Sequence, residues 1–456
     1  MTACSSEFLS RVSAVVGPEN LTLDQPGLTS GSRDCFHFSP VLIPQLEGRT
    51  AEAIAFPRTQ EQLRELIALS VRQEVAVTPR GGGTGNYGQG VPLHGGLMIN
   101  TRRMDRILRL DSAEAHVEAG VRLWSIEQEA ARHGAELRMF PSTVVTSSAA
   151  GFITGGSGGI GSVQWGMLRD LDNIRQATIL TCEANPRRLE LRTADELADV
   201  LHNCGLTAFA TEVVFALAPK TQWHQYVLAF DDFQEALACA QEVATDRALG
   251  KRLATVFEWP VPSYFVPLVR RGACPEGKAL AFLMTPLPPQ QMADHLSRLG
   301  VDGGECTFHL EPNAKPAARK GFQIYDFTWN HTTQWAMKSD PKLTYLQENF
   351  DPDRVATQLR ERRQRFGDQV QSHIEFIYDP DAGVVRPGGL SIVKFRGKRD
   401  LWRLIDYCEA HGIQIANPHT HYLDDDTRWY GDNFLAAKDR WDPNHLLNPG
   451  HLRALE

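Results

Sequence analysis

The chain has 456 residues, 42% hydrophobic and 22% charged, with a net charge of -8 and a pI near 6.0. That length exceeds one ordinary hydrophobic core, so we expect two or three domains. The acidic balance argues against a broad basic surface for nucleic acid. No stretch of about 18 apolar residues could span a bilayer, and the N-terminus lacks the pattern of a signal peptide. We therefore expect a cytoplasmic protein with no membrane span.

Eight cysteines are scattered along the chain without a C-x-x-C pair or a zinc-like spacing. None stands beside a His or Arg in a way that marks a nucleophile. We expect reduced thiols, with neither a zinc site nor a catalytic cysteine.

The first elements predict a β-α-β unit. Residues 51–57 are a short apolar strand, and Thr59 and Gln62 follow with the spacing of a capping box that begins a helix. Residues 74–79 then return as a strand. Further strands are expected at residues 96–100, 107–110 and 116–119, and a helix from Leu123 to His133 ends at Gly134. The unit is a small mixed lobe.

The pattern of predicted elements changes at about Trp223. Strands and helices over residues 226–310 follow the order β-α-β-β-α-β, and a loosely similar unit recurs over residues 372–416. Between the two regions lie a run of small residues at 147–162 and apolar strands at 177–180 and 205–219. The last stretch holds a short helix and then Pro and Gly. An α+β cap is therefore predicted after the first lobe.

Two glycine-rich runs indicate a cofactor. The motif Gly83-x-Gly85-x-x-Gly88 follows a strand, but Tyr87, Gly90 and Pro92 prevent the helix that a Rossmann fingerprint needs at that point. Backbone N–H groups of such a loop can instead converge on an anion as a nest. A second motif, Gly156-x-Gly158-x-x-Gly161, lies about seventy residues later. We expect both runs to be helix-free and to enclose one extended cofactor.

Four segments together carry a family resemblance. In the order PRGGGTGNYGQG, FPSTVVTSSAAGFITGGSGGIGSVQWG, CGLTAFATEVVFAL and KDRWDPNHLLNPG, the chain resembles the vanillyl-alcohol oxidase and p-cresol methylhydroxylase (PCMH) family of FAD enzymes. The nearest branch holds glycolate oxidase subunits and D-lactate dehydrogenases. The resemblance implies an α+β fold with a two-lobed PCMH-type FAD-binding domain at residues 1–220. It also implies a substrate cap of ferredoxin-like repeats at residues 221–416. A C-terminal segment at 417–456 would then return to the FAD domain.

The same resemblance implies which residues bind FAD. Thr84 stands where some relatives carry a His bonded to the flavin, and the second run has no Cys, so non-covalent FAD is expected, although attachment through His419 or His421 stays open. The implied cofactor-binding residues are Arg80, Gly81, Gly82, Gly83, Thr84, Gly85, Pro141, Ser142, Thr143, Ser148, Gly151, Gly155, Gly156, Gly158, Ala210, Val213, Lys438 and Asn448.

Candidate catalytic residues lie in the cap and at the start of the C-terminal segment. His373 and Glu375 share one face of a predicted strand, and His419 and His421 repeat that spacing. Asn330 and His331 belong to an aromatic and polar segment at 325–338 that lines a pocket or packs two domains together. Lys394 and Arg386 are the nearest cations for a substrate carboxylate. The metal-binding H-x-G-D-x-N-x-H motif of the hydroxy-acid branch is not intact, so no metal is expected.

These observations predict an FAD-dependent dehydrogenase or oxidase. It would remove hydride from a small alcohol or hydroxy acid, with His419 or His421 taking the hydroxyl proton. Two alternatives stay open: a flavoenzyme of the same fold that performs a cyclisation or a reaction without net oxidation, and a nucleotide-binding module without turnover. The expected partners are a small-molecule substrate and an unidentified electron acceptor, and a homodimer is possible.

Overall fold

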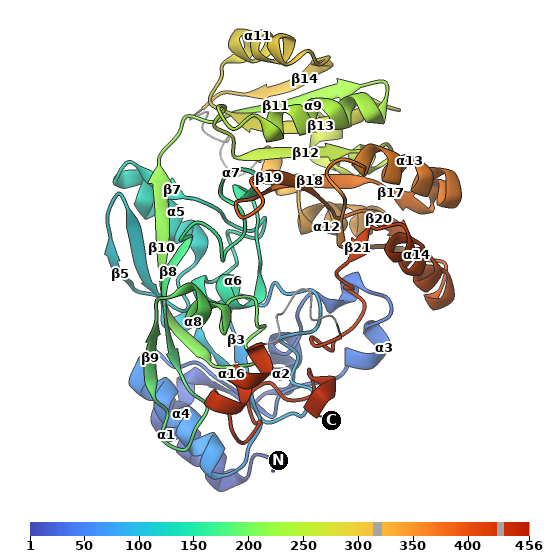
Figure 1. Ribbon diagram of the computed structural model, residues 1–456. Helices are drawn as coiled ribbons and strands as arrows, with labels where there is room; N and C mark the ends of the chain where they lie inside the picture. The colour runs from blue at the N-terminus through green and yellow to red at the C-terminus, as the bar shows by residue number, and fades with distance from the viewer. Residues whose placement is uncertain (313–321, 426–432, 456) are drawn as a thin grey trace.

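Four β-sheets organise the part of the chain that the computed structural model describes, residues 1–312, 322–425 and 433–455. Two of them form the lower lobes in Figure 1, and an eight-stranded sheet forms the cap above them. A three-stranded sheet lies at the side of the cap. This is the α+β, PCMH-type arrangement that the sequence predicts.

The first lobe is a small, largely parallel sheet ordered β1-β2-β4-β3. Its main helix begins as predicted, because the Thr59 hydroxyl accepts a hydrogen bond from the Gln62 amide at 3.2 Å. The helix residues Leu63, Leu66 and Ile67 are fully buried. The elements of this lobe are α1 (Ser6–Val16), β1 (Leu21–Thr22), α2 (Gln25–Gly31), α3 (Ile43–Leu46), β2 (Ala53–Ala55), α4 (Gln60–Arg72), β3 (Val77–Arg80) and β4 (Leu97–Asn100).

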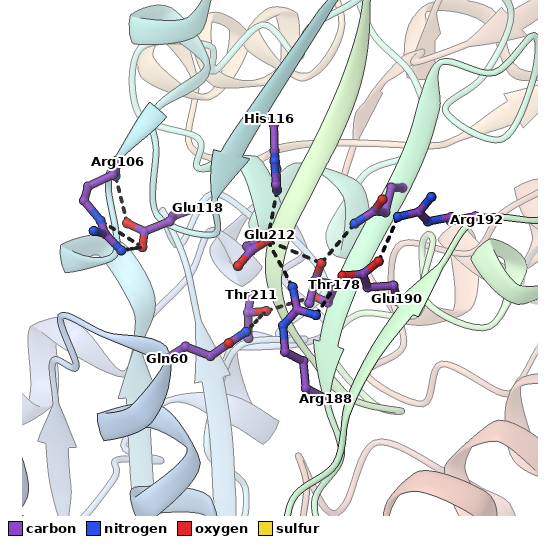
Figure 2. Close-up of polar contacts among 11 residues, drawn as sticks. Gln60, Arg106, His116, Glu118, Thr178, Arg188, Glu190, Arg192, Thr211 and Glu212 are labelled. Carbon is purple, nitrogen blue, oxygen red and sulfur yellow. Dashed lines mark hydrogen bonds and ion pairs between the residues drawn. The ribbon is translucent and has the colours of Figure 1, made fainter. Parts of the chain in front are cut away.

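The second lobe is an antiparallel sheet ordered β5-β6-β10-β8-β9. One face of this sheet carries charges: in Figure 2, Glu212 contacts His116 at 2.9 Å and Arg188 at 3.6 Å from two other strands. Val213, the next residue on the strand, is fully buried on the opposite face, as the period of two requires. The elements of this lobe are β5 (Ile107–Leu110), β6 (Glu114–Glu118), α5 (Leu123–Arg132), β7 (Ala135–Leu137), α6 (Ala149–Gly155), α7 (Ser162–Trp165), β8 (Ile174–Leu180), β9 (Arg188–Leu191), α8 (Ala194–Ala198) and β10 (Phe209–Pro219).

The cap begins with the predicted β-α-β-β-α-β unit. Its strands pair in the order β14-β11-β13-β12, which is the ferredoxin-like arrangement. The helices α9 and α11 supply a buried apolar stripe against this sheet. The elements of the unit are β11 (His224–Phe230), α9 (Phe233–Thr245), β12 (Leu253–Phe257), α10 (Val266–Val269), β13 (Ala279–Thr285), α11 (Pro289–Leu299) and β14 (Glu305–Leu310).

The second half of the cap continues the same sheet as β18-β19-β16-β21. Two of its helices, α12 and α13, were not predicted, because their apolar residues show no clear helical period. The segment at 325–338 is therefore mostly helix. The elements are α12 (Asn330–Ser339), β15 (Leu343–Tyr345), β16 (Glu348–Asn349), α13 (Val355–Phe366), β17 (Val370–Gln371), β18 (His373–Asp379), β19 (Val384–Gly389), β20 (Ile392–Lys394), α14 (Lys398–Ala410) and β21 (Gln414–Ile415).

The C-terminal segment contacts the first lobe again. After α16 (Asn433–Trp441), the Leu446 carbonyl accepts a hydrogen bond from the Val77 amide at 2.8 Å, and the Asn448 amide donates to the Val77 carbonyl at 2.6 Å. Figure 1 shows this red segment beside the blue first lobe. It therefore adds a bridge to β3, the strand that leads into the first glycine run. None of the helices described here has the length and apolar character needed to cross a membrane.

Candidate active site

A cavity of about 460 Å³ lies between the two glycine runs and the cap. Its floor comes from residues 80–90 and 141–158, and its roof from α12, β16, β18 and residues 415–425. Residues far apart in the sequence thus line one cavity.

The first glycine run forms an anion nest. The N–H groups of residues 81–85 donate no hydrogen bond to any described group, so five consecutive donors remain for a ligand. The guanidinium of Arg80 lies under this loop, where it donates to the carbonyls of Gly90, at 3.2 Å, and Arg33. Arg80 therefore fixes the loop from below, and burial lowers its pKa.

An acid neighbours the same loop. Asp34 is only 6% exposed, lines the cavity and accepts a hydrogen bond from the Phe36 amide at 2.9 Å. Burial raises its pKa to about 6, although the nearby Arg80 opposes that shift. No signal in the sequence singled out Asp34, because it lies in an irregular segment.

The two glycine runs pack directly on each other. A Cβ on Gly82 would lie 2.5 Å from the Thr146 carbonyl oxygen and 3.1 Å from the Ser147 Cα. The Thr84 hydroxyl also lies 3.1 Å from the Ser147 hydroxyl. Glycine is required at position 82 because the backbones approach too closely for a side chain.

The second run is not helix-free, which corrects our prediction. Ser148 caps a helix, α6, by accepting a hydrogen bond from the Gly151 amide at 3.3 Å, and this helix ends at Gly155. The cap was missed because the run is dominated by small residues with no apolar period. Residues 156–161 form the predicted loop beyond the helix.

The residues of the two runs fit the flavin nucleotide that the resemblance implies. The nest supplies donors for a pyrophosphate, and the glycine backbones leave an elongated space beside it. The predicted cofactor-binding residues that line the cavity are Arg80, Gly81, Gly82, Gly83, Thr84, Gly85, Pro141, Ser142, Thr143, Ser148, Gly151, Gly155, Gly156, Gly158 and Ala210.

Three of the implied cofactor-binding residues lie outside that lining. Val213 packs in the core of the second lobe, on strand β10 between β6 and β8. Lys438 is buried with Asp442, 2.6 Å away. Asn448 donates to the carbonyls of Gln89, at 2.8 Å, and Cys204, at 3.2 Å. Lys438 and Asn448 thus secure the tail and the loop behind the cavity, without lining it.

Of the acid–base residues predicted from the sequence, Glu375 is the one that reaches the cavity from the cap. Its Oε1 accepts hydrogen bonds from the Trp329 amide at 2.7 Å and from His373 Nε2 at 2.9 Å. No described group bonds to Oε2, so that oxygen remains for a ligand. The predicted shared face of His373 and Glu375 explains their contact within one strand.

Trp329 joins Glu375 to the second glycine run. Its ring lies 3.5 Å from the position of a Cβ on Gly158. Its backbone has φ 51° and ψ -141°, a conformation that costs a bulky residue roughly 1–3 kcal/mol. Such strain at the cavity wall is typical of a functional site. Asn330, the next residue, also lines the cavity.

The four predicted histidines are not among the lining residues. His419 is buried: its Nδ1 lies 2.8 Å from the Ser39 hydroxyl and its Nε2 3.0 Å from the Tyr345 carbonyl, and burial lowers its pKa to about 3. The carbonyl of His421 accepts from His451, and its ring lies against Tyr422. Burial lowers the pKa of His331 to about 4. His373 stacks on Phe257 behind Glu375. These placements do not support His419 or His421 as the catalytic base.

The two cations suggested by the sequence also lie elsewhere. Arg386 pairs with Asp379 at 2.5 Å, and Lys394 pairs with Asp368 at 2.5 Å, both with half-exposed side chains. No sequence pattern predicted that Gln347, Glu348, Asn349 or Glu409 would line the cavity, because they come from a two-residue strand, the residue before it and a helix. The fold alone brings them to the cavity.

Comparisons with known proteins identify the domain that holds the two glycine runs. Residues 51–190 match the family model described as an FAD binding domain. An uncharacterised FAD-linked oxidoreductase of Mycobacterium tuberculosis is 30% identical over 247 residues, which is 52% of each chain. The glycolate oxidase subunit of Escherichia coli is 28% identical over 40% of this chain and 38% of its own. The D-lactate dehydrogenase of Archaeoglobus fulgidus is 26% identical over 44% and 47%.

The fold has relatives among solved structures. Alkyldihydroxyacetonephosphate synthase superposes with a TM-score of 0.73 at 17% identity, over 98% of this chain and 87% of that one. The aligned part of this chain spans about half, or less, of the length of the sequence relatives. Residues 51–190 of this chain thus form an FAD-binding domain similar to those of FAD-linked oxidoreductases, and FAD is its cofactor.

Proposed function

We propose that this protein is an oxidoreductase that removes hydride from the hydroxyl-bearing carbon of a small alcohol or hydroxy acid. The observation that carries the proposal is the Glu375 carboxylate, which faces the same cavity as the two glycine runs. When bound, FAD supplies the hydride acceptor. Similarity to a glycolate oxidase subunit and a D-lactate dehydrogenase supports a CH–OH donor.

In this proposal the parts of the chain bind either the cofactor or the substrate. Residues 1–220 and the tail from 417 hold the cofactor, and residues 221–416 carry the substrate side. The nest at residues 81–85 binds the pyrophosphate through its free N–H groups. The cap supplies Glu375 and Trp329 from β18 and the start of α12.

Glu375 takes the hydroxyl proton of the substrate. The Trp329 amide and the His373 ring hold Oε1, and Oε2 is the oxygen that receives the proton. The second nitrogen of His373, Nδ1, is buried without a hydrogen-bond partner. His373 therefore acts through Nε2 alone, which holds Oε1 of Glu375 and orients the carboxylate.

The test uses the purified protein with its FAD. Anaerobic addition of alcohols and hydroxy acids should bleach the flavin absorbance and give a product more oxidised than the substrate. The Glu375→Gln variant should retain FAD and lose turnover by about a hundredfold or more, as expected for removal of an acid–base group. Normal turnover in that variant would remove Glu375 from the mechanism.

A matched control separates this role from general damage. Glu348→Gln changes another cavity-lining carboxylate, but one that is already paired with Arg362. The Glu348→Gln variant should have a lower free energy of unfolding, but it keeps the carboxylate that takes the proton. At temperatures below its unfolding transition it should therefore turn over normally. If substrates bleach no flavin, or if the products are no more oxidised than the substrates, the proposed oxidation is refuted.

A further inference from the structure

We propose that His224, His309 and Glu311 form a metal site that binds one zinc ion at the outer edge of the cap. Each side chain offers one ligand atom, and these atoms all lie within 4.8 Å of one another. None of the three residues lines the cavity beside the glycine runs, so this site is separate from the one described above. The inference therefore does not depend on the proposed function.

Two neighbouring strands bring the three side chains together. In the register of β11 with β14, Tyr226 lies opposite His309. His224 precedes Tyr226 by two residues and Glu311 follows His309 by two, so antiparallel pairing sets His224 opposite Glu311 on the same face of the sheet. No local motif predicts this site, because 85 positions separate the two histidines.

The two histidines are already in contact. His224 Nδ1 lies 3.0 Å from His309 Nε2, and the rings are 9° from parallel with centroids 5.2 Å apart. Tetrahedral zinc bound to two imidazoles at about 2.0–2.1 Å holds their nitrogens about 3.3 Å apart. The separation therefore needs to grow by only about 0.3 Å. Zinc replaces the hydrogen between the two nitrogens, that proton leaves to solvent, and both rings turn toward the ion.

Tyr226 supports the histidine pair. Its ring stacks on His309 with centroids 4.8 Å apart, and it lies 6.3 Å from the ring of His224. Its hydroxyl donates to the Leu287 carbonyl at 2.6 Å, which fixes the position of the ring. His224 is only 8% exposed, whereas Glu311 is exposed. The site thus combines two packed imidazoles with a carboxylate that can move to complete the ligand set.

The donor set selects zinc among the common divalent ions. Two imidazoles and one carboxylate are a ligand combination that zinc accepts, with a fourth position left for water. Magnesium and calcium prefer sets of oxygen ligands, and this site has one carboxylate. β14 is the last strand on its side of the eight-stranded sheet, at the outer edge of the cap in Figure 1. A bound ion would therefore tie this edge strand to β11.

The experiment measures zinc binding to the FAD-loaded protein after treatment with EDTA and removal of the chelator. Isothermal titration calorimetry should give one zinc ion per chain, with a heat that varies with the buffer because binding releases a proton. Zinc should also raise Tm, since it binds the folded protein. Mg²⁺ and Ca²⁺ at the same concentrations should give no comparable binding.

Variants then assign the ion to the named residues. Glu311→Gln and His309→Ala should each weaken zinc binding by at least about tenfold, since even a lost outer-shell partner costs about that much. Glu305→Gln, at another exposed acid on β14, is the matched control and should bind zinc as the wild type does. Because Glu311 is exposed, Glu311→Gln keeps the test decisive if His309→Ala does not fold.

Hydrogen exchange tests the tie between the strands. Zinc should slow exchange of the β14 amides in the wild type and in Glu305→Gln, but not in Glu311→Gln. The inference is overturned if no stoichiometric zinc binds, if Glu311→Gln binds it as tightly as the wild type, or if Mg²⁺ or Ca²⁺ binds as well. Zinc binding without slower β14 exchange would refute the tie. Flavin reduction enters none of these readouts, so the proposed function stands or fails separately.

Discussion

The close packing of the two glycine runs makes Gly82→Ala a direct test of the cofactor site. A methyl group at this position would lie 2.5 Å from the Thr146 carbonyl oxygen, and ordinary contacts begin at 3.4 Å. One backbone must therefore move by about 0.9 Å, the difference between those two distances. Because both neighbours are backbone atoms, no side chain can turn aside to absorb the change.

The expected cost is that of an overpacked core, about 1–3 kcal/mol. If this free energy is lost from the FAD-binding conformation of the two loops, FAD binding weakens by roughly 5-fold to 150-fold. The assay is fluorescence titration of the FAD-free protein with FAD, together with the increase in Tm that FAD produces. Both the affinity and that increase should fall.

Gly250→Ala is the matched control for this substitution. Its nearest neighbour, a Pro286 ring carbon, lies 3.9 Å from the new methyl position, and the site is in the cap outside the cavity lining. It should leave FAD binding and Tm unchanged. Wild-type FAD affinity and Tm in Gly82→Ala would refute the reasoning, because they would show that the two runs separate at no cost.

Three further predictions concern stability. The ring of His419 stays neutral in the folded protein, since burial lowers its pKa to about 3. In the unfolded chain the same ring takes up a proton below about pH 6.5. Tm should therefore fall as the pH drops from 6.5 toward 4. His419→Gln should flatten that slope in calorimetric scans, and an unchanged slope would contradict the buried neutral ring. Arg362→Met should cost about 3–5 kcal/mol in denaturant unfolding, because the buried Glu348 loses its partner, and a loss below about 1 kcal/mol would argue against that pair. Asn448→Ala should cost about 2 kcal/mol by removing the two hydrogen bonds that its side chain donates to the Gln89 and Cys204 carbonyls, and wild-type stability would exclude this role.

Local structure followed the sequence wherever a periodic apolar pattern was present. The helix after Thr59, the helix ending at Gly134 and the β-α-β-β-α-β unit of the cap all lie where the pattern predicted them. Patterns failed where small or polar residues dominate. Helix α6 begins at a serine cap inside a glycine-rich run, and α13 carries charged residues on most of its surface.

The candidate catalytic residues show the limit of spacing arguments. His373 with Glu375 and His419 with His421 have the same separation in sequence, yet only Glu375 of the four lines the cavity. His419 instead fills a buried position between the Ser39 hydroxyl and the Tyr345 carbonyl. A spacing of two fixes which side chains share a face of a strand, but it does not say what that face meets.

The sequence by itself determined the cofactor and the local elements of this protein. Both depend on contiguous stretches: glycines that leave N–H groups free for an anion, and apolar residues at a helical or strand period. Only the tertiary structure decided the substrate side. Glu375, Gln347 and Glu409 come from three separate segments of the cap, and their approach to one cavity depends on how the cap sheet and its helices pack over the two lobes.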